Sequence, residues 1–180
     1  MIRKTIFFPV IICSFFIIGN AQTKMPTDSK THQHRDEEPV TVYEGKGIEG
    51  IAVGKSAMND VAEKFGKNYR WEVNKKYSYQ MTYDRLGVAF YMCQSDKRRK
   101  IFLIEIKLPY KAKTGKGVIL GKSTKEDTEK IYGKSKDGFK YRGVSFYYNT
   151  FGSKKIISEI DVTENSGIRQ CKVEQQKINK

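Results

Sequence analysis

An internal repeat restricts the possible folds of this chain more than any other feature of its sequence. Residues 50–67 align without a gap on residues 117–134, with seven identities at a constant offset of 67. Further along, Gly-Val-Ala-Phe-Tyr at 87–91 matches Gly-Val-Ser-Phe-Tyr at 143–147. Such self-similarity indicates two copies of one supersecondary unit. The expected boundaries are 43–112 for repeat 1, 113–163 for repeat 2 and 164–180 for a C-terminal tail.

Each copy starts with a short predicted helix. Ser56 and Ser123 stand where a helix N-cap belongs, and Glu126, three residues after Ser123, would complete a capping box. Apolar residues then recur at helical spacing as far as Gly66 and Gly133, which are typical helix stops. A helix of about ten residues is marginal alone. Its apolar face must therefore pack on another element.

That element is predicted to be a sheet. Alternating apolar and polar residues mark five candidate strands, at 77–83, 88–93, 102–108, 139–148 and 156–162. Polar turns over 94–99 and 149–154 predict hairpins, and hence antiparallel pairing. The expected fold class is α+β, with two tandem helix-plus-antiparallel-hairpin repeats and short helices packed on one face of an antiparallel sheet.

The N-terminus is predicted to be a secretory signal peptide over residues 1–21. Arg3 and Lys4 precede an apolar run, and small residues up to Ala21 are typical of a cleavage site. The run is about 13 residues long, whereas a membrane-spanning helix needs roughly 18 or more. A membrane anchor is thus the less favoured alternative. We expect a flexible leader over 22–42 and a periplasmic or secreted protein with no transmembrane span after signal removal.

The cysteines favour the same compartment. Cys13 lies inside the apolar run and not at its end, which disfavours a lipid-attached N-terminus. Cys93 and Cys171 remain in an oxidising environment and are candidates for a disulfide, with two free buried thiols as the alternative. The only histidines, His32 and His34, fall in the leader. We therefore expect no metal site and no cysteine nucleophile.

Two triplets resemble the end of a phosphate-binding loop. Gly-Lys-Ser occurs at 54–56 and at 121–123, but the glycine that should stand five positions before the second glycine is replaced by Glu49 and Lys116. The serines are better explained by the helix starts. We therefore expect no cofactor and no enzymatic activity.

The repeat unit resembles a known family. A Val-Gly-Lys-Ser start, a helix ending in Phe-Gly, and a Gly-Val-x-Phe strand followed by an Ile-rich strand are similar to the repeat of the BamE (SmpA/OmlA) outer-membrane lipoproteins and of the tandem β-lactamase inhibitory proteins. The resemblance covers about residues 47–162. It implies an envelope or secreted protein that binds another protein, with the tandem sheet as the contact face. No lipobox cysteine follows the signal, which departs from the BamE family.

The chain is strongly basic, with 34 Lys and Arg against 20 Asp and Glu, a formal net charge of +14 and a pI near 9.6. This excess points to polyanions or acidic surfaces as partners. It is spread through both copies, which favours general attraction to acidic surfaces over a dedicated nucleic-acid groove.

Repeat 1 carries an insertion that repeat 2 lacks. Twenty residues separate its helix stop from Gly87, but nine separate the equivalent glycines of repeat 2. The stretch 67–85 mixes aromatic with basic side chains, as interface hot spots and base-stacking surfaces do. The alternative is an extra edge strand with its aromatics facing the core. With the basic turn over 97–100, the expected partner-binding residues are Tyr69, Arg70, Trp71, Lys75, Lys76, Tyr77, Tyr79, Tyr83, Arg98 and Arg99.

The functional expectation is an exported, non-enzymatic, bacterial envelope or secreted module that binds another protein, an acidic one above all, as a scaffold or inhibitor. The alternative is a binder of anionic polymers such as glycan, lipopolysaccharide or nucleic acid. Salt distinguishes the two, because a polyanion binder loses affinity steeply as counterion release weakens.

Overall fold

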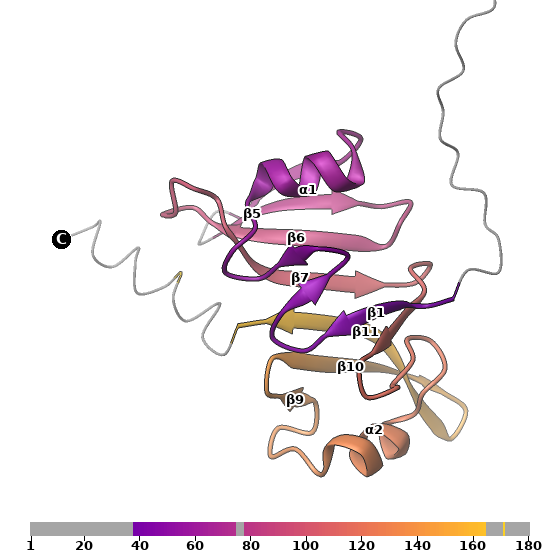
Figure 1. The fold of residues 1–180 in the computed structure, drawn as a ribbon. Coiled ribbons are helices and arrows are strands. Elements are labelled where there is room, and N and C mark those ends of the chain that lie inside the picture. Colours follow the sequence, from indigo (N-terminus) through magenta and orange to yellow (C-terminus); the bar gives the residue numbers. More distant parts are fainter. Residues whose placement is uncertain (1–37, 75–77, 165–170, 172–180) are drawn as a thin grey trace, which may run out of the picture. The chain divides into compact units, whose positions relative to one another are not determined.

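The computed structural model describes residues 38–74, 78–164 and 171 (Figure 1). Within this part of the chain there are two helices and eleven strands. In chain order they are β1 (Val40–Tyr43), β2 (Gly47–Ile48), β3 (Ile51–Ala52), α1 (Met58–Phe65), β4 (Arg70–Asn74), β5 (Ser78–Tyr83), β6 (Val88–Cys93), β7 (Ile101–Lys107), β8 (Ala112–Thr114), α2 (Lys125–Tyr132), β9 (Lys140–Tyr141), β10 (Val144–Phe151) and β11 (Lys154–Thr163). We call residues 43–112 the first copy and residues 113–163 the second copy.

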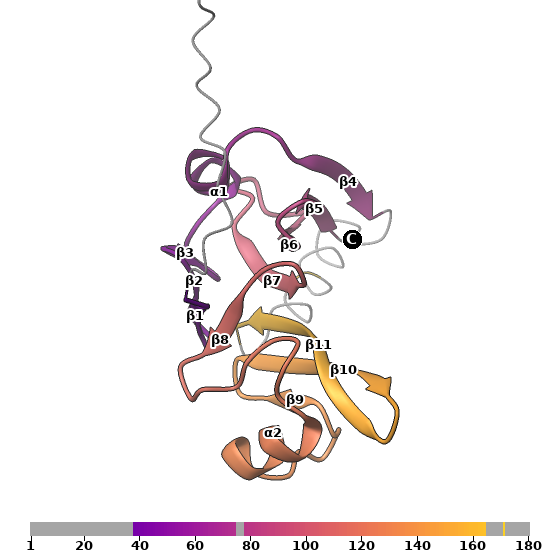
Figure 2. The same ribbon diagram turned by 90° about the vertical axis from the view of Figure 1, so that its right-hand side faces the viewer.

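Seven strands form one antiparallel sheet in the order β4-β5-β6-β7-β11-β10-β9 (Figures 1 and 2). The copies meet inside this sheet, where β7 of the first pairs with β11 of the second. Ile106 lies opposite Ile160, and Ile104 lies opposite Val162. All four side chains are fully buried. Since a slip of one residue would turn them to the other face, burial specifies the register between the copies.

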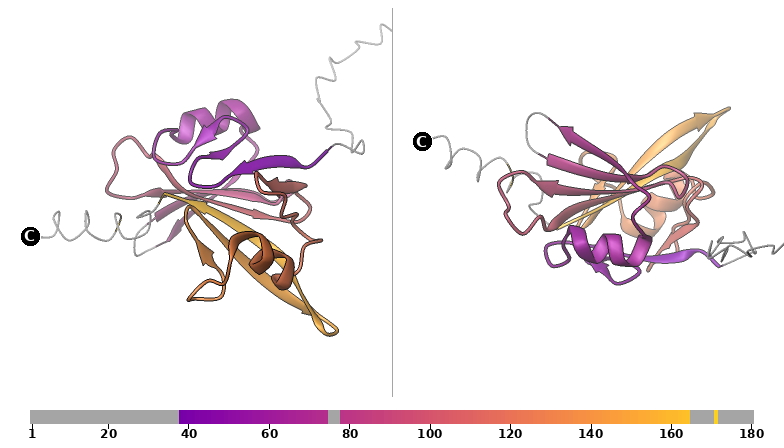
Figure 3. Two further views of the ribbon diagram at one scale, coloured as in Figure 1. Left: turned by 60° about the horizontal axis from the view of Figure 1, so that its bottom comes forward. Right: turned by 90° about the horizontal axis from the view of Figure 1, so that it is seen from above.

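Four short strands form a second sheet in the order β3-β2-β1-β8. Its apolar side chains share one core with the large sheet and α1, and Figure 3 shows β1 and α1 on the same side of that sheet. β1 runs parallel to β8, with Val40 opposite Ala112. The tight turn between β2 and β3 requires Gly47, because its φ is +134° and a Cβ there would overlap the Ile51 carbonyl oxygen.

Each helix begins one residue later than its serine predicts. Ser56 Oγ accepts a hydrogen bond from the Ala52 amide (3.0 Å), and Ser123 Oγ accepts the equivalent bond from the Ile119 amide (2.9 Å). Both hydroxyls therefore close the turn that leads into the helix. The expectation that these serines are N-caps is wrong, because each side chain bonds an amide that precedes it.

The N-cap positions are Ala57 and Thr124. The Ala57 amide donates to Asp60 Oδ2 (2.8 Å), and the Thr124 amide donates to Asp127 Oδ2 (2.9 Å). Thr124 Oγ1 also accepts from the Asp127 amide (3.1 Å), which completes a capping box in the second copy. Asp127, and not Glu126, is thus the acidic member of that box.

A repeated aromatic contact holds each helix on the large sheet. Phe65 at the end of α1 lies 5.1 Å from Phe90 in β6, and Tyr132 at the end of α2 lies 5.2 Å from Phe146 in β10, measured between ring centroids. Phe90 and Phe146 are fully buried. Paired rings of this kind add about 0.5–1.5 kcal/mol each to the burial of their area. The two helices therefore pack on the sheet through the same kind of ring contact, made by residues 67 positions apart, Phe65 and Tyr132.

The expected α+β class, with two tandem helix-plus-antiparallel-hairpin repeats, is wrong, because the described chain is mostly β. Its two helices have eight residues each, whereas the strands build a seven-stranded antiparallel sheet and a four-stranded sheet. Strands β2 and β3 have two residues and β8 has three, too few to show an alternating pattern. The segment expected as a flexible leader also ends in strand, since Val40–Tyr43 forms β1.

Candidate functional site

Trp71 and Tyr79 stack on each other at the β4 edge of the large sheet, with ring centroids 5.2 Å apart and planes 26° apart. Trp71 lies opposite Met81, and Val73 lies opposite Tyr79, so the two rings are diagonal neighbours on one face. The Arg99 guanidinium lies 5.5 Å from the centroid of Trp71 and 5.0 Å from that of Tyr79. We call Trp71, Tyr79 and Arg99 the aromatic–basic corner.

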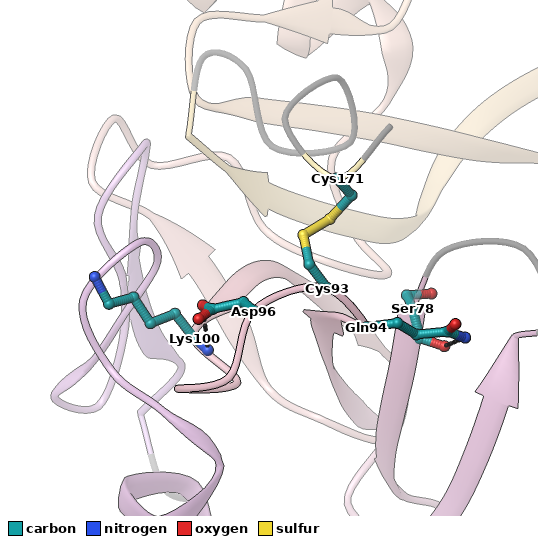
Figure 4. The surroundings of a disulfide bond; sticks show 6 residues. All are labelled: Ser78, Cys93, Gln94, Asp96, Lys100 and Cys171. Atoms are coloured by element: carbon teal, nitrogen blue, oxygen red, sulfur yellow. Dashed lines mark hydrogen bonds between the residues drawn. A yellow bond between two sulfur atoms is a disulfide. The ribbon is translucent and has the colours of Figure 1, made fainter. Parts of the chain in front are cut away.

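The β6–β7 turn positions Arg99. Asp96 organises this turn. Its carboxylate accepts a hydrogen bond from the Lys100 amide (3.1 Å; Figure 4) and one from the Arg98 amide (2.9 Å), and its carbonyl accepts one from the Arg99 amide (2.9 Å). Arg99 has a φ of +49°. One of its guanidinium nitrogens lies 3.6 Å from the sulfur of Met58. The turn therefore presents the guanidinium to the two rings from a fixed backbone.

The positive charge of Arg99 stays available. Its side chain is exposed, and no described carboxylate forms an ion pair with it. A guanidinium stacked on aromatic rings keeps its donors free for a carboxylate or phosphate. The aromatic–basic corner is thus built to receive an anionic group beside an apolar surface.

Two of the expected contact residues belong to the core. Tyr83 is 3% exposed, and its hydroxyl donates to the Gly66 carbonyl (2.7 Å). Burial, followed by the neighbouring Tyr69, raises the pKa of Tyr83 to about 12. The Tyr69 ring is partly buried and lies 5.8 Å from the Tyr83 ring. Both residues stabilise the packing of α1 and β5.

Arg70 is used inside the molecule. Its Nη2 bonds Asp84 Oδ1 (2.9 Å), its Nε bonds Asp84 Oδ2 (3.0 Å), and its Nη1 also contacts Glu72. The hydrogen bond from Arg70 lowers the pKa of Asp84. Arg98 is exposed, whereas the expected residues Lys75, Lys76 and Tyr77 lie outside the described residues.

A carboxylate cluster on the opposite face of the large sheet was missed by the sequence reasoning. Glu105 on β7 and Glu159 and Asp161 on β11 place one oxygen each within 4.8 Å of one another, close enough to hold a cation. Lys107 Nζ bonds Glu105 (2.7 Å) and Glu159 (3.0 Å), and the Tyr91 hydroxyl donates to Glu105 (2.9 Å). Only the pairing of β7 with β11 brings these residues together, so no local pattern marks them.

The cluster is compensated internally. Burial, followed by the charges of Glu159 and Glu105, raises the pKa of Asp161 to about 8. Asp161 is therefore mostly protonated at neutral pH, and Lys107 balances part of the remaining charge. The three carboxylates, Lys107 and Tyr91 thus form one partly buried polar network on this face of the sheet.

A disulfide joins Cys93 at the end of β6 to Cys171, with Cα atoms 5.3 Å apart (Figure 4). The two cysteines are 7% and 1% exposed, and they pack with Phe102 and Leu103 in a small second core. Next to this bond, the side-chain amide nitrogen Nε2 of Gln94 donates to the Ser78 carbonyl (3.4 Å). The bond fastens the chain after β11 to the first copy.

A groove of about 610 Å³ lies where the β10–β11 hairpin passes the end of β7. Leu108 and Phe151 are 59% and 61% exposed at its sides. Its lining residues are Lys107, Leu108, Gly121, Asn149, Phe151, Ile156, Ile157, Ser158 and Glu159. Nothing in the described chain covers these two apolar side chains.

No family model, no curated protein and no solved structure matches this chain. The resemblance to the BamE family and to the β-lactamase inhibitory proteins thus rests on the quoted motifs and stays a prediction. Among the described residues, neither helix has the length and apolar character needed to cross a membrane.

Proposed function

We propose that this chain is an exported, non-enzymatic module that binds an acidic surface of another protein through the aromatic–basic corner. The observation that carries the proposal is the stacked Arg99, which lies over both rings and has no acidic partner among the described residues. Export is proposed from the N-terminal sequence, which lies outside the described residues.

Aromatic and arginine side chains support protein recognition for a physical reason. They bury a large area at small cost in rotamer entropy and keep a polar group at the contact. Around the corner, Lys97 and Arg98 are exposed and add positive charge. An acidic partner would gain both a charge-assisted bond and apolar contact in one place.

Capture from an envelope extract tests the proposal. The bait is the mature chain, and the variants are Arg99→Asn, which suits the positive φ of this position, and Arg142→Asn, an exposed arginine of the second copy that removes the same charge elsewhere. We expect one captured protein, identified by mass spectrometry, to be lost with Arg99→Asn and kept with Arg142→Asn.

An equal loss with both variants, together with a steep fall in capture as salt rises, would instead identify a binder of anionic polymers. Capture that is unchanged by Arg99→Asn and by Trp71→Ala in folded protein would remove the corner from the binding site.

A further inference from the structure

Most of one edge of strand β10 has no neighbour among the described residues. It pairs with β11 over its whole length, from Val144 opposite Val162 to Phe151 opposite Lys154. On its other side, β9 pairs with Val144 and Ser145 alone. The bond from the Phe146 amide to the Phe139 carbonyl (2.9 Å) is the last contact of this kind in the described chain. Figure 3 shows the hairpin extending past the neighbouring strands.

The first copy shows what completes such an edge. Phe90 in β6 and Phe146 in β10 make the same contact with their helices, 56 residues apart, so β6 and β10 correspond. In β6, Met92 lies opposite Tyr79, and Cys93 lies opposite Ser78 of β5. The second copy is shorter between its helix and this strand, and the two-residue β9 stands in the place of β5, with Tyr141 opposite Val144 as Tyr83 lies opposite Val88. Its positions equivalent to Met92 and Cys93 are left open.

The open edge directs backbone groups outward. Ile157 of β11 lies opposite Tyr148. Its amide donates to the Ser123 carbonyl (3.0 Å), and its carbonyl accepts from the Gly121 amide (2.9 Å). Both backbone groups of Ile157 therefore point away from β10. In an antiparallel ladder, Tyr148 then directs its own N–H and C=O to the free edge, and Thr150 does the same two residues later. An added strand would find two donors and two acceptors.

This edge has little of the usual protection: its register with β11 shifts between Tyr147 and Tyr148, but the strand carries no charged residue and no proline. Natural edge strands discourage pairing with charged residues, proline or bulges. β10 reads Val-Ser-Phe-Tyr-Tyr-Asn-Thr-Phe, without charge or proline, and its Phe151 is 61% exposed. By contrast, β4 at the opposite edge carries Arg70 and Glu72. The less protected strand is the one whose equivalent is covered in the first copy.

We propose that residues 147–151 of β10 bind an extended acidic segment of a partner protein as an added antiparallel strand. The acidic character follows from exposed lysines around the edge, with Lys154 and Lys155 opposite the last residues of β10 and Lys140 in β9. A second copy of this chain is a poorer occupant, because pairing two such edges would bring like charges together. The inference rests on the proposed function, because the β10 edge would be a second contact for the partner protein that binds at the aromatic–basic corner.

A designed peptide provides the probe. It carries the β5 sequence Ser-Tyr-Gln-Met-Thr-Tyr with two glutamates at each end, and a scrambled peptide of the same composition is its control. On the full mature chain, we expect the β5 peptide to slow amide hydrogen exchange at Tyr148 and Thr150 and the scrambled peptide to have no such effect. Equal exchange with both peptides overturns the proposal, whatever the variants below show.

Thr150 offers a matched pair of variants. Thr150→Pro removes the outward N–H and leaves the bonds to β11 in place, as edge strands allow, while Thr150→Ala keeps the N–H. We expect Thr150→Pro to weaken peptide binding about tenfold, measured by fluorescence anisotropy, and Thr150→Ala to leave it unchanged. Equal affinities of these variants contradict the proposal.

Two further results separate the hypotheses. Trp71→Ala should keep full peptide binding, because the aromatic–basic corner lies at the other edge of the sheet. If protein capture does not depend on the corner, the result for the β10 edge therefore still stands. Sedimentation tests the rival occupant. A dimer of the wild type that Thr150→Pro abolishes would show that a second copy occupies the edge and would overturn the acidic segment.

Discussion

The Arg99 guanidinium lies 5.0 Å from the centroid of the Tyr79 ring, although 19 residues, including the whole of β6, separate the two in sequence. β5 and the β6–β7 turn bring them together, and Trp71 from β4 adds the second ring. The feature that we connect with binding is therefore assembled by three parts of one sheet edge. A change that disturbs the aromatic–basic corner therefore indicates a change in the sheet edge as well as in the proposed binding site.

Replacing Arg99 with Asn should change the surroundings of Trp71, the single tryptophan of the chain. We expect a red shift of its fluorescence emission and a loss of about 0.5–1 kcal/mol in the free energy of unfolding, the usual contribution of an exposed cation–π contact. Urea titrations followed by fluorescence measure both. Arg98→Asn removes the same charge one residue earlier and should leave the emission unchanged; a red shift of equal size there would contradict the stacking.

The two buried phenylalanines under the helices should be of similar importance. Phe90→Ala and Phe146→Ala each remove a fully buried ring, and each should lower the free energy of unfolding by about 3–5 kcal/mol. Because β7 and β11 join the copies in one sheet, we expect a single cooperative transition for both variants in circular dichroism. Two separate transitions would show that the copies unfold independently.

The carboxylate cluster makes stability depend on pH. The pKa of Asp161 is raised from its usual value to about 8, so between about pH 4 and pH 8 the folded state keeps a proton that the unfolded chain has released. The free energy of unfolding should therefore fall as pH rises through this range. Glu105 and Glu159 face Asp161 with negative charge, and Lys107 contributes the positive charge.

Asp161→Asn keeps the group neutral at every pH and isolates this effect. Compared with the wild type, it should gain stability progressively from pH 4 to pH 8, as measured by urea midpoints. Asp84→Asn is the control: hydrogen bonding by Arg70 lowers the pKa of Asp84, so its effect on stability changes only below about pH 4 and should stay constant from pH 4 to pH 8. If Asp161→Asn and the wild type show parallel pH profiles, Asp161 is ionised in the folded protein at neutral pH.

Removing the disulfide should cost stability without changing the fold. Its cysteines are 78 residues apart, and a crosslink of that span contributes up to about 4 kcal/mol by restricting the unfolded chain. Cys93→Ala combined with Cys171→Ala should lower the urea midpoint, and reduction of the wild type should lower it by the same amount. Unchanged midpoints in both cases would show that the thiols are not joined in solution.

Local patterns predicted the single elements better than their assembly. Alternation predicted strands that overlap β6 and β11, and Gly66 and Gly133 end the helices as expected. The pairing of β7 with β11 had no local signal, because many strands of buried isoleucines could lie side by side. For this reason the cluster of Glu105 and Asp161 on neighbouring strands was missed. The fold class was missed because the helices have only eight residues each and because β2, β3 and β8 are too short to show alternation.

The same reason limits what composition could say about the site. The mixture of aromatic and basic residues over 67–85 predicted a contact region that includes Trp71 and Tyr79, which stays a prediction, but it did not indicate which side chains face the core. Tyr83 alternates with the same period as Tyr79 and is buried against Phe65 of α1, whereas Tyr79 is only partly buried and lies beside Arg99. Only the position of α1 over the strand distinguishes them.

The parallel pairing of β1 with β8 has a consequence for the order of folding. Val40 pairs with Ala112, which follows 72 positions later, so β1 has no neighbour on its β8 side until that part of the chain is present. Contacts of such long separation form slowly, because a long loop must close first. During folding, β1 must therefore stay unpaired on that side until the chain between Val40 and Ala112 has closed into a loop. A chain truncated before residue 112 should leave β1 exposed to proteases, and extension by a few tens of residues should protect it.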